Sequence, residues 1–232
     1  MKSTLLAIDT STDACSVALL HNGEIFSDHQ LLPREHTQNI LPMVEAILSN
    51  NSVAMVDVDG LVVGAGPGSF TGLRIAFGVV QGFAFAVEKP VAAISTLTAL
   101  AARAKLLLST EQLQKDGDVI ATVDARMNET YWARYRCSEG SLQMLESPKV
   151  SGPASIDLSD AKAVIGTGLV YQDQMLGITE ETALFSEERP RAEDMLRYIQ
   201  AYPEQVSWQS ADQVEPLYVR NDVAKKKAEQ QK

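Results

Sequence analysis

The chain has 232 residues, of which 45% are hydrophobic, and 20 basic against 30 acidic side chains give it a formal charge of −10. This composition excludes intrinsic disorder and argues against independent binding to nucleic acid, because affinity for phosphates depends on Lys and Arg. No apolar run reaches the roughly 20 residues that cross a bilayer, and the sequence lacks a secretory signal pattern, so we expect a cytoplasmic protein.

The first hundred residues predict an α/β layer that opens with three antiparallel strands. Asn22-Gly23 is a strong hairpin signal between the second and the third. Pro42 leaves two alternatives for the first helix, a cap at Asn39 or a kink at Pro42. In chain order, we expect strands at 4–8, 14–20, 24–32, 60–64 and 91–94 and helices at 37–50, 73–87 and 96–108. This order is typical of a mixed sheet covered by helices.

A weaker version of the same pattern follows residue 108. Strands are expected at 119–123, 130–136 and 163–165, less regularly at 142–150, and helices at 170–176 and 192–202. We therefore expect a first domain over 1–108 and a smaller, degenerate second copy over 109–222. The basic run Lys225 to Lys227 predicts a solubilising tail over 223–232.

Two segments of the first domain are candidate phosphate sites. The turn Asp9, Thr10, Ser11 and Thr12 joins two strands, where hydroxyls and N–H groups can cradle phosphate, although such residues also satisfy their own backbone. The glycine-rich stretch 64–72 lacks the Lys of a Walker A loop and the third glycine of a dinucleotide fingerprint. Its glycines, among them Gly66 and Gly68, still allow close backbone approach at a helix start, and Ser69 and Thr71 are natural helix caps. The loop is therefore either a binding site or a tight contact with a partner.

The helix expected at 73–87 has two informative faces. Gly78, Gly82 and Ala86 form a strip of small residues, for which we expect close packing inside the molecule. Arg74, Phe77, Gln81, Phe85 and Glu88 form a second stripe whose polar members indicate that it faces outward. Two phenylalanines on such a stripe indicate either an interface with a partner, which is favoured, or a partly buried edge. The first 100 residues carry only 4 basic and 9 acidic side chains, so this part of the chain is either deeply buried or covered by a partner.

Other catalytic patterns are missing from the sequence. His21, His29 and His36 lack metal-ligand spacing, and two cysteines are too few for a disulfide framework. No Gly-x-Ser-x-Gly elbow occurs. The charged turn Asp124, Arg126 and Glu129 is interpreted as a salt-bridged loop rather than an acid/base pair.

Five segments stand out together: AIDTSTDACSVAL at 7–19, REHTQNILP at 34–42, GAGPGSFTGLRIAFGVVQGFA at 64–84, VDARMNETYWARY at 123–135 and EPLYVRN at 215–221. The chain resembles the bacterial TsaB family, also called YeaZ, in which such segments occur in this order. The resemblance implies an α/β fold of the actin, hexokinase and Hsp70 (ASKHA) type, with two RNase H-like domains that contain mixed sheets.

The resemblance also implies a role in forming threonylcarbamoyladenosine beside the anticodon of tRNAs that read codons starting with A. TsaB-like chains resemble a non-catalytic partner that activates TsaD, the transferase, while the ATPase TsaE supports turnover. ATP and metal are then expected on the partners, with no cofactor on this chain and tRNA only indirectly bound. The two helices of the first domain would pair with TsaD or with a second copy, through Met43, Ile47, Arg74, Phe77, Gln81 and Phe85.

Residues of the TsaD metal site are absent where the resemblance places them. Ser95 and Ala99 stand at the positions of the His pair, and His36 alone is insufficient, so peptidase activity is unsupported. The alternative function is an ATP-dependent phosphotransferase of the sugar- or acetate-kinase class, with Asp9 and the glycine-rich loop at the phosphates and Gly166-Thr167-Gly168 as a nucleotide loop. For the partner hypothesis, we expect Phe77→Asp to weaken association.

Overall fold

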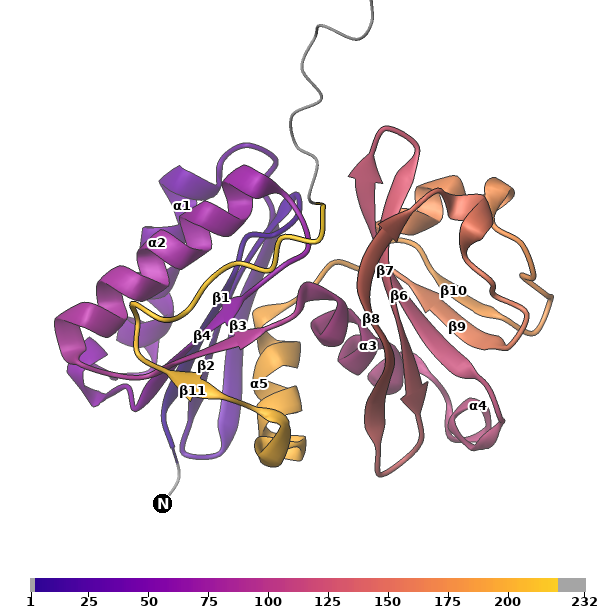
Figure 1. Cartoon of the computed structure of the whole chain (residues 1–232). Helices are drawn as coiled ribbons and strands as arrows, with labels where there is room; N and C mark the ends of the chain where they lie inside the picture. Colours follow the sequence, from indigo (N-terminus) through magenta and orange to yellow (C-terminus); the bar gives the residue numbers. More distant parts are fainter. Residues whose placement is uncertain (1–2, 221–232) are drawn as a thin grey trace, which may run out of the picture.

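Two mixed sheets lie side by side in the computed structural model, which describes residues 3–220 (Figure 1). The first sheet has the strand order β11-β5-β4-β1-β2-β3 and the second β10-β9-β6-β7-β8. In each sheet, the first strand of an antiparallel hairpin also pairs with a parallel strand along its other edge. These pairs are β1 with β4 in the first sheet and β6 with β9 in the second. The ASKHA-type α/β fold with two related sheets is therefore confirmed. The tail predicted at 223–232 lies outside the described residues.

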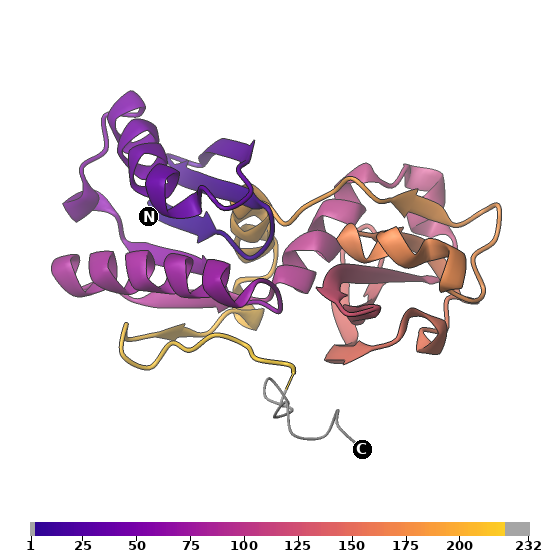
Figure 2. The same cartoon turned by 90° about the horizontal axis from the view of Figure 1, so that it is seen from above.

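The first sheet is built as the apolar runs predict. Its strands are β1 (Leu5–Asp9), β2 (Ala14–His21), β3 (Glu24–Leu31), β4 (Gly60–Gly64), β5 (Val91–Ile94) and β11 (Trp208–Gln209). The hairpin at Asn22-Gly23 has positive φ at both residues, which these two residue types tolerate. Two helices cover one face of this sheet, α1 (His36–Asn50) and α2 (Phe70–Val87) (Figures 1 and 2).

The second sheet repeats the arrangement with shorter helical cover. Its strands are β6 (Asp118–Arg126), β7 (Glu129–Cys137), β8 (Leu142–Ser151), β9 (Ala161–Ile165) and β10 (Ala183–Phe185). The helix expected at 170–176 is instead the 3-10 segment η3 (Thr167–Gln174), and a short α4 (Thr110–Gln114) was not predicted. Other short 3-10 turns are η1 (Met55–Asp57), η2 (Pro153–Ser155) and η4 (Pro203–Gln205).

Local signals explain most helix boundaries. Ser69 caps α2, since its hydroxyl accepts a hydrogen bond from the N–H of Gly72 at 3.2 Å, so the helix begins three residues earlier than expected. Pro42 lies inside α1, which starts at His36 without a side-chain cap. Asn39 does not cap it, because its amide donates back to the carbonyl of Glu35.

Two helices lie between the sheets and cross the predicted domain boundary. The first, α3 (Thr96–Leu107), lies in the sequence range of the expected first domain, yet it packs on β6 and β9 of the second sheet. The second, α5 (Ala192–Ala201), lies in the range of the expected second domain, yet it packs on β1, β2 and β3. The strand β11 also returns to the first sheet, where Trp208 pairs with Ala92. A division at residue 108 therefore does not separate the two units.

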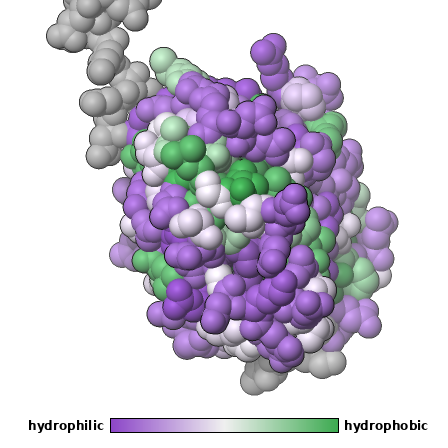
Figure 3. Space-filling view, turned by 90° about the vertical axis from the view of Figure 1, so that its right-hand side faces the viewer, coloured by the Kyte–Doolittle hydropathy of each residue, from purple (hydrophilic) through white to green (hydrophobic). Residues whose placement is uncertain are grey.

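The buried residues reflect this exchange of helices. One hydrophobic cluster fills the space between α1, α2 and the first sheet. A second cluster is continuous across both units, because α3 and α5 pack on each other between the two sheets (Figure 2). From the side of the second unit, the surface is mostly hydrophilic, with hydrophobic side chains in separate patches (Figure 3).

Candidate functional site

The β1–β2 turn holds the first candidate residues, and its polar groups bond to one another. The N–H and hydroxyl of Ser11 donate to Asp9 Oδ1 at 3.0 and 2.8 Å. The hydroxyl of Thr10 donates to the carbonyl of Gly72 at 2.7 Å, and Thr12 Oγ1 accepts from the N–H of Ala14. The hydroxyls of the turn are thus bonded within the protein, which favours a structural role for these residues.

The glycine-rich loop covers this turn at backbone contact distance. A Cβ atom on Gly68 would lie 2.3 Å from the carbonyl oxygen of Ser11, and one on Gly72 would lie 1.9 Å from that of Thr10. The N–H of Ser69 donates to the same Ser11 oxygen at 2.7 Å. Glycines stand at these positions because the backbones of the two loops touch.

Asp9 points away from solvent. Its carboxyl is 1% exposed, and Oδ2 faces Gly64, where an added Cβ would lie 1.8 Å away. Oδ2 has no hydrogen-bond partner. Burial raises the pKa of Asp9 to about 6, against the opposing effect of the two Ser11 hydrogen bonds. A carboxyl enclosed in this way is badly placed to hold a hydrated magnesium ion.

A cleft of ≈ 1130 Å³ lies between the two units. The cleft is lined by five segments: the β1–β2 turn, the glycine-rich loop, the β6–β7 hairpin, η3 and residues 217–220. The loop Gly166-Thr167-Gly168 packs on β6, because a Cβ on Gly166 would lie 2.0 Å from the carbonyl of Thr122 and the hydroxyl of Thr167 accepts from the N–H of Asp124. Its glycines therefore have a structural explanation too.

The charged turn between β6 and β7 is salt-bridged, as the sequence indicates. Asp124 pairs with Arg126 at 2.9 Å, and Glu129 pairs with Arg220.

The cysteines, Cys15 and Cys137, are both buried and unpaired, and burial raises the pKa of the Cys15 thiol to about 12.

The stripe expected to face outward on α2 is divided by the structure. Phe77 is 4% exposed and packs in the core with Met43 and Ile47 of α1, so these three do not form a surface. Gln81 turns toward the segment 211–214, where its amide donates to the carbonyls of Ala211 and Val214, each at 3.0 Å. Of the six candidate interface residues, only Arg74 and Phe85 are exposed.

The strip of small residues faces outward, contrary to expectation. A Cβ on Gly78 or Gly82 would meet no atom within 4 Å, and Ala86 is exposed beside Phe85, which is 83% exposed. Among the described residues, α2 is the helix with the length and apolar composition to cross a membrane, yet one face of it packs on the first sheet. Its other face is an apolar surface, hereafter the α2 outer face, formed by Gly78, Gly82, Phe85 and Ala86.

Between residues 3 and 220, no group of three or more His, Cys, Asp or Glu side chains gathers that could hold a metal. Ser95 caps α3 by accepting from the N–H of Leu97, and Ala99 is buried in the core. His36 is buried, with Nε2 3.2 Å from the carbonyl of Ala14. These positions have structural roles.

Comparisons with known proteins agree with the sequence motifs. A family model described as TsaD, tRNA N6-adenosine threonylcarbamoyltransferase, matches residues 30–186. The "tRNA threonylcarbamoyladenosine biosynthesis protein TsaB" of Escherichia coli K12 is 38% identical over 96% of this chain and 97% of that protein. The chain belongs to the TsaB family. A second TsaB, from Haemophilus influenzae, is 41% identical over 97% of this chain and 96% of that protein.

The family assignment extends to the three-dimensional structure. The solved structure of YeaZ from Pseudomonas aeruginosa matches with a TM-score of 0.81 and 42% sequence identity, over 93% of this chain and 99% of that one. The resemblance to the TsaB family, drawn from five sequence segments, is therefore confirmed over nearly the whole chain.

Proposed function

We propose that this chain acts in tRNA threonylcarbamoyladenosine biosynthesis as a non-catalytic subunit that pairs with and activates a TsaD-like transferase. Membership of the TsaB family supports the biosynthetic role. We base the non-catalytic role on the β1–β2 turn, whose Thr10 and Ser11 hydroxyls bond within the protein and whose Asp9 carboxyl is buried against Gly64. We propose that ATP, the metal and the transfer chemistry belong to the partners, including a TsaE-like ATPase.

The α2 outer face is the proposed pairing surface. It combines an apolar side chain that is almost fully exposed, Phe85, with glycines that let another helix approach closely. Exposed apolar area of this kind is costly in water unless a partner covers it. The partner is a TsaD-like protein or, in its absence, a second copy of this chain. Contact with tRNA is then indirect, which fits the charge of −10.

A drop-out reconstitution tests the role. Threonylcarbamoyladenosine formed on substrate tRNA is measured with the purified pathway proteins, with and without this chain. We expect activity to vanish without the chain and to return when it is added, while the chain alone forms no product. Undiminished activity without the chain would refute an obligatory subunit.

A substitution on the α2 outer face tests the pairing surface. Phe85→Asp places a charge in the proposed contact, so we expect association with the TsaD-like partner to weaken at least about tenfold, measured by calorimetry. Val170→Asp is the matched control, because Val170 is an exposed apolar side chain on the second unit. Equal affinity of the two variants would contradict the assignment. Phe77→Asp is unsuitable, since Phe77 lies in the core.

The cleft favours one alternative, an ATP-dependent phosphotransferase. Its volume of ≈ 1130 Å³ is ample for a nucleotide. Stoichiometric binding of ATP and Mg²⁺ by the isolated chain would support this alternative. We expect no such binding, because the Thr10 and Ser11 hydroxyls are already bonded within the protein and the carboxyl of Asp9 is buried.

A further inference from the structure

The cleft is crossed by polar bridges at several places. In proteins with two units around a cleft, the units commonly close on each other by a hinge motion when a ligand binds. Such motion requires that few strong contacts join the units away from the hinge. Here, three sets of contacts join them, one behind the cleft, one at its side and one at its mouth.

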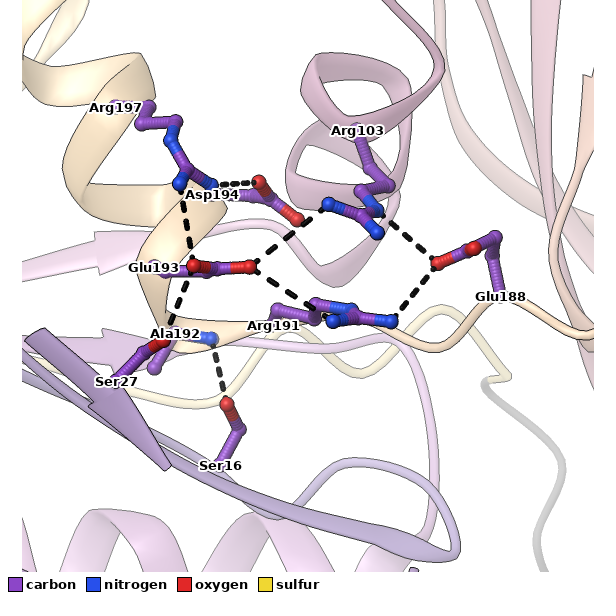
Figure 4. A network of polar contacts seen from close by, with 9 residues as sticks. All are labelled: Ser16, Ser27, Arg103, Glu188, Arg191, Ala192, Glu193, Asp194 and Arg197. Carbon is purple, nitrogen blue, oxygen red and sulfur yellow. Dashed lines mark hydrogen bonds and ion pairs between the residues drawn. The ribbon is translucent and has the colours of Figure 1, made fainter. Parts of the chain in front are cut away.

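The first bridge lies behind the cleft, where α3 meets α5 (Figure 4). Arg103 of α3 reaches Glu188, in the segment before α5, with Nε and Oε2 3.1 Å apart. The same guanidinium lies 3.8 Å from Glu193 of α5. All three side chains are largely buried, so water and salt screen these pairs less than they screen pairs on the surface.

Further arginines complete the network around these carboxylates. Arg191 lies 3.4 Å from Glu188 and 3.8 Å from Glu193, and Arg197 contacts Glu193 at 3.2 Å and Asp194 at 2.9 Å (Figure 4). Three arginines thus face three carboxyls. Separating α3 from α5 would leave the largely buried guanidinium of Arg103 without its carboxylate partners, which is costly.

The second bridge lies at the side of the cleft and joins the first unit to the segment between β10 and α5. Arg189 binds Asp13 of the β1–β2 turn through two hydrogen bonds, Nε to Oδ1 at 3.1 Å and Nη2 to Oδ2 at 3.2 Å. Its Nη1 also donates to the carbonyl of Glu187 at 2.7 Å, which fixes the direction of the guanidinium. A bidentate pair of this geometry resists both sliding and rotation of the two segments.

The third bridge crosses the mouth of the cleft. The segment Ser210–Arg220, hereafter the strap, follows the first unit, where Leu217 donates its N–H to the carbonyl of Ala65 at 2.8 Å. Arg220 at its end reaches the second unit, donating to the carbonyl of Ala125 at 3.2 Å and pairing with Glu129. The strap is drawn in yellow in Figure 1.

The β6–β7 hairpin that receives Arg220 is held in an unusual conformation. Arg126, Met127 and Asn128 all have positive φ, between 57° and 62°, which costs roughly 1–2 kcal/mol for each residue other than glycine. Two further tethers fix the hairpin: Asp124 accepts from the hydroxyl of Tyr171, and the amides of Asn128 and Gln174 bond reciprocally. Arg220 therefore binds a rigid target rather than a mobile loop.

We propose that the three bridges clamp the two units at one fixed opening, so that this protein does not undergo the closure that its two-unit fold permits. The continuous hydrophobic cluster through α3 and α5 also opposes closure, because rotation of either unit would disturb the packing of this cluster. A clamped cleft presents the same surface whether or not a nucleotide is available. This inference concerns the free chain and does not depend on the proposed function.

Pulsed electron spin resonance tests the clamp directly. Spin labels are attached to Gln38→Cys on α1 and Gln172→Cys in η3, both exposed and on opposite units; the native cysteines are buried and stay unlabelled. We expect one narrow distance distribution. A broad or two-peaked distribution would overturn the proposal without any further variant.

Variants then identify the bridges. In the labelled chain, Arg189→Met together with Arg220→Met removes the charged groups of the side and mouth bridges and keeps an unbranched side chain at each position. We expect the distance distribution to broaden at least about twofold. Arg136→Met is the matched control, because Arg136 pairs with Asp118 inside the second unit, and its distribution should match the parent. A double variant as narrow as the control would show that these bridges do not hold the units.

Discussion

Asp9 carries a buried carboxyl with one unpartnered oxygen, and this has a measurable effect on stability. Its pKa is about 6 in the folded chain against 3.8 for a free side chain. Between these values, the folded state holds a proton that the unfolded state has lost. Stability therefore falls as the pH rises from 4 to 6, and above pH 6 the folded chain bears the whole penalty, about 3 kcal/mol.

We expect Asp9→Asn to raise the free energy of unfolding at pH 8 and to have little effect at pH 4, measured by urea titration at both values. Asp13→Asn is the control, for which we expect the free energy of unfolding at pH 8 to change in the opposite direction. Burial alone would raise the pKa of Asp13, but its hydrogen bonds with Arg189 hold that pKa below its usual value, so this substitution should cost stability at pH 8. A pH-independent effect of Asp9→Asn would contradict the assignment.

Residue types and spacing predicted the Asp9–Thr12 turn and the glycine-rich loop before α2, but not which way each side chain of α2 points. Phe77 and Phe85 lie eight residues apart on a helix that is apolar nearly all round. In such a helix, hydrophobic periodicity does not separate the buried face from the exposed one. Only the position of the first sheet decides that Phe77 is buried and Phe85 exposed.

At the scale of elements, α2 offers two glycines in opposite surroundings. A Cβ on Gly72 would lie 1.9 Å from the carbonyl of Thr10, whereas one on Gly78 would meet nothing within 4 Å. We expect Gly72→Ala to lower the free energy of unfolding by on the order of 3 kcal/mol, because two backbones must move apart. Gly78→Ala should raise it by up to about 1 kcal/mol through helix propensity.

Thermal and urea unfolding of the isolated chain measure both effects. The two substitutions add the same methyl group to the same helix, so each serves as the control for the other. Equal stabilities of the two variants would mean that the loop can move away from the β1–β2 turn, which would also weaken the argument that the turn is permanently covered.

Most elements could be predicted from the sequence, because apolar runs, Asn22-Gly23 and the cap at Ser69 are local signals. The exchange of α3 and α5 between units could not. Each of these helices has an apolar face that fits either sheet, and the choice depends on contacts between residues far apart in the chain. The two-residue strand β11 is too short to leave a pattern, and its pairing with β5 is likewise a long-range contact.

At the scale of the whole molecule, the exchange of helices predicts one cooperative unit. The fragment 1–108 lacks α5 and β11, so Leu5, Ala7 and Ala18 on its sheet would lose their cover. We expect this fragment not to fold alone, as judged by dispersed NMR spectra, and the full chain to unfold in a single calorimetric transition. A folded 1–108 fragment, or two separate transitions, would show that the units are independent.

The late position of α5 and β11 also matters while the chain is being synthesised. Five strands of the first sheet are complete once Ile94 has emerged, but β11 starts only at Trp208. At about 5–20 residues per second, the interval is on the order of ten seconds. During that time an apolar sheet face is open to any chaperone or hydrophobic surface near the ribosome. The first sheet, which is begun by the N-terminal residues, is thus completed only after the second sheet has been synthesised.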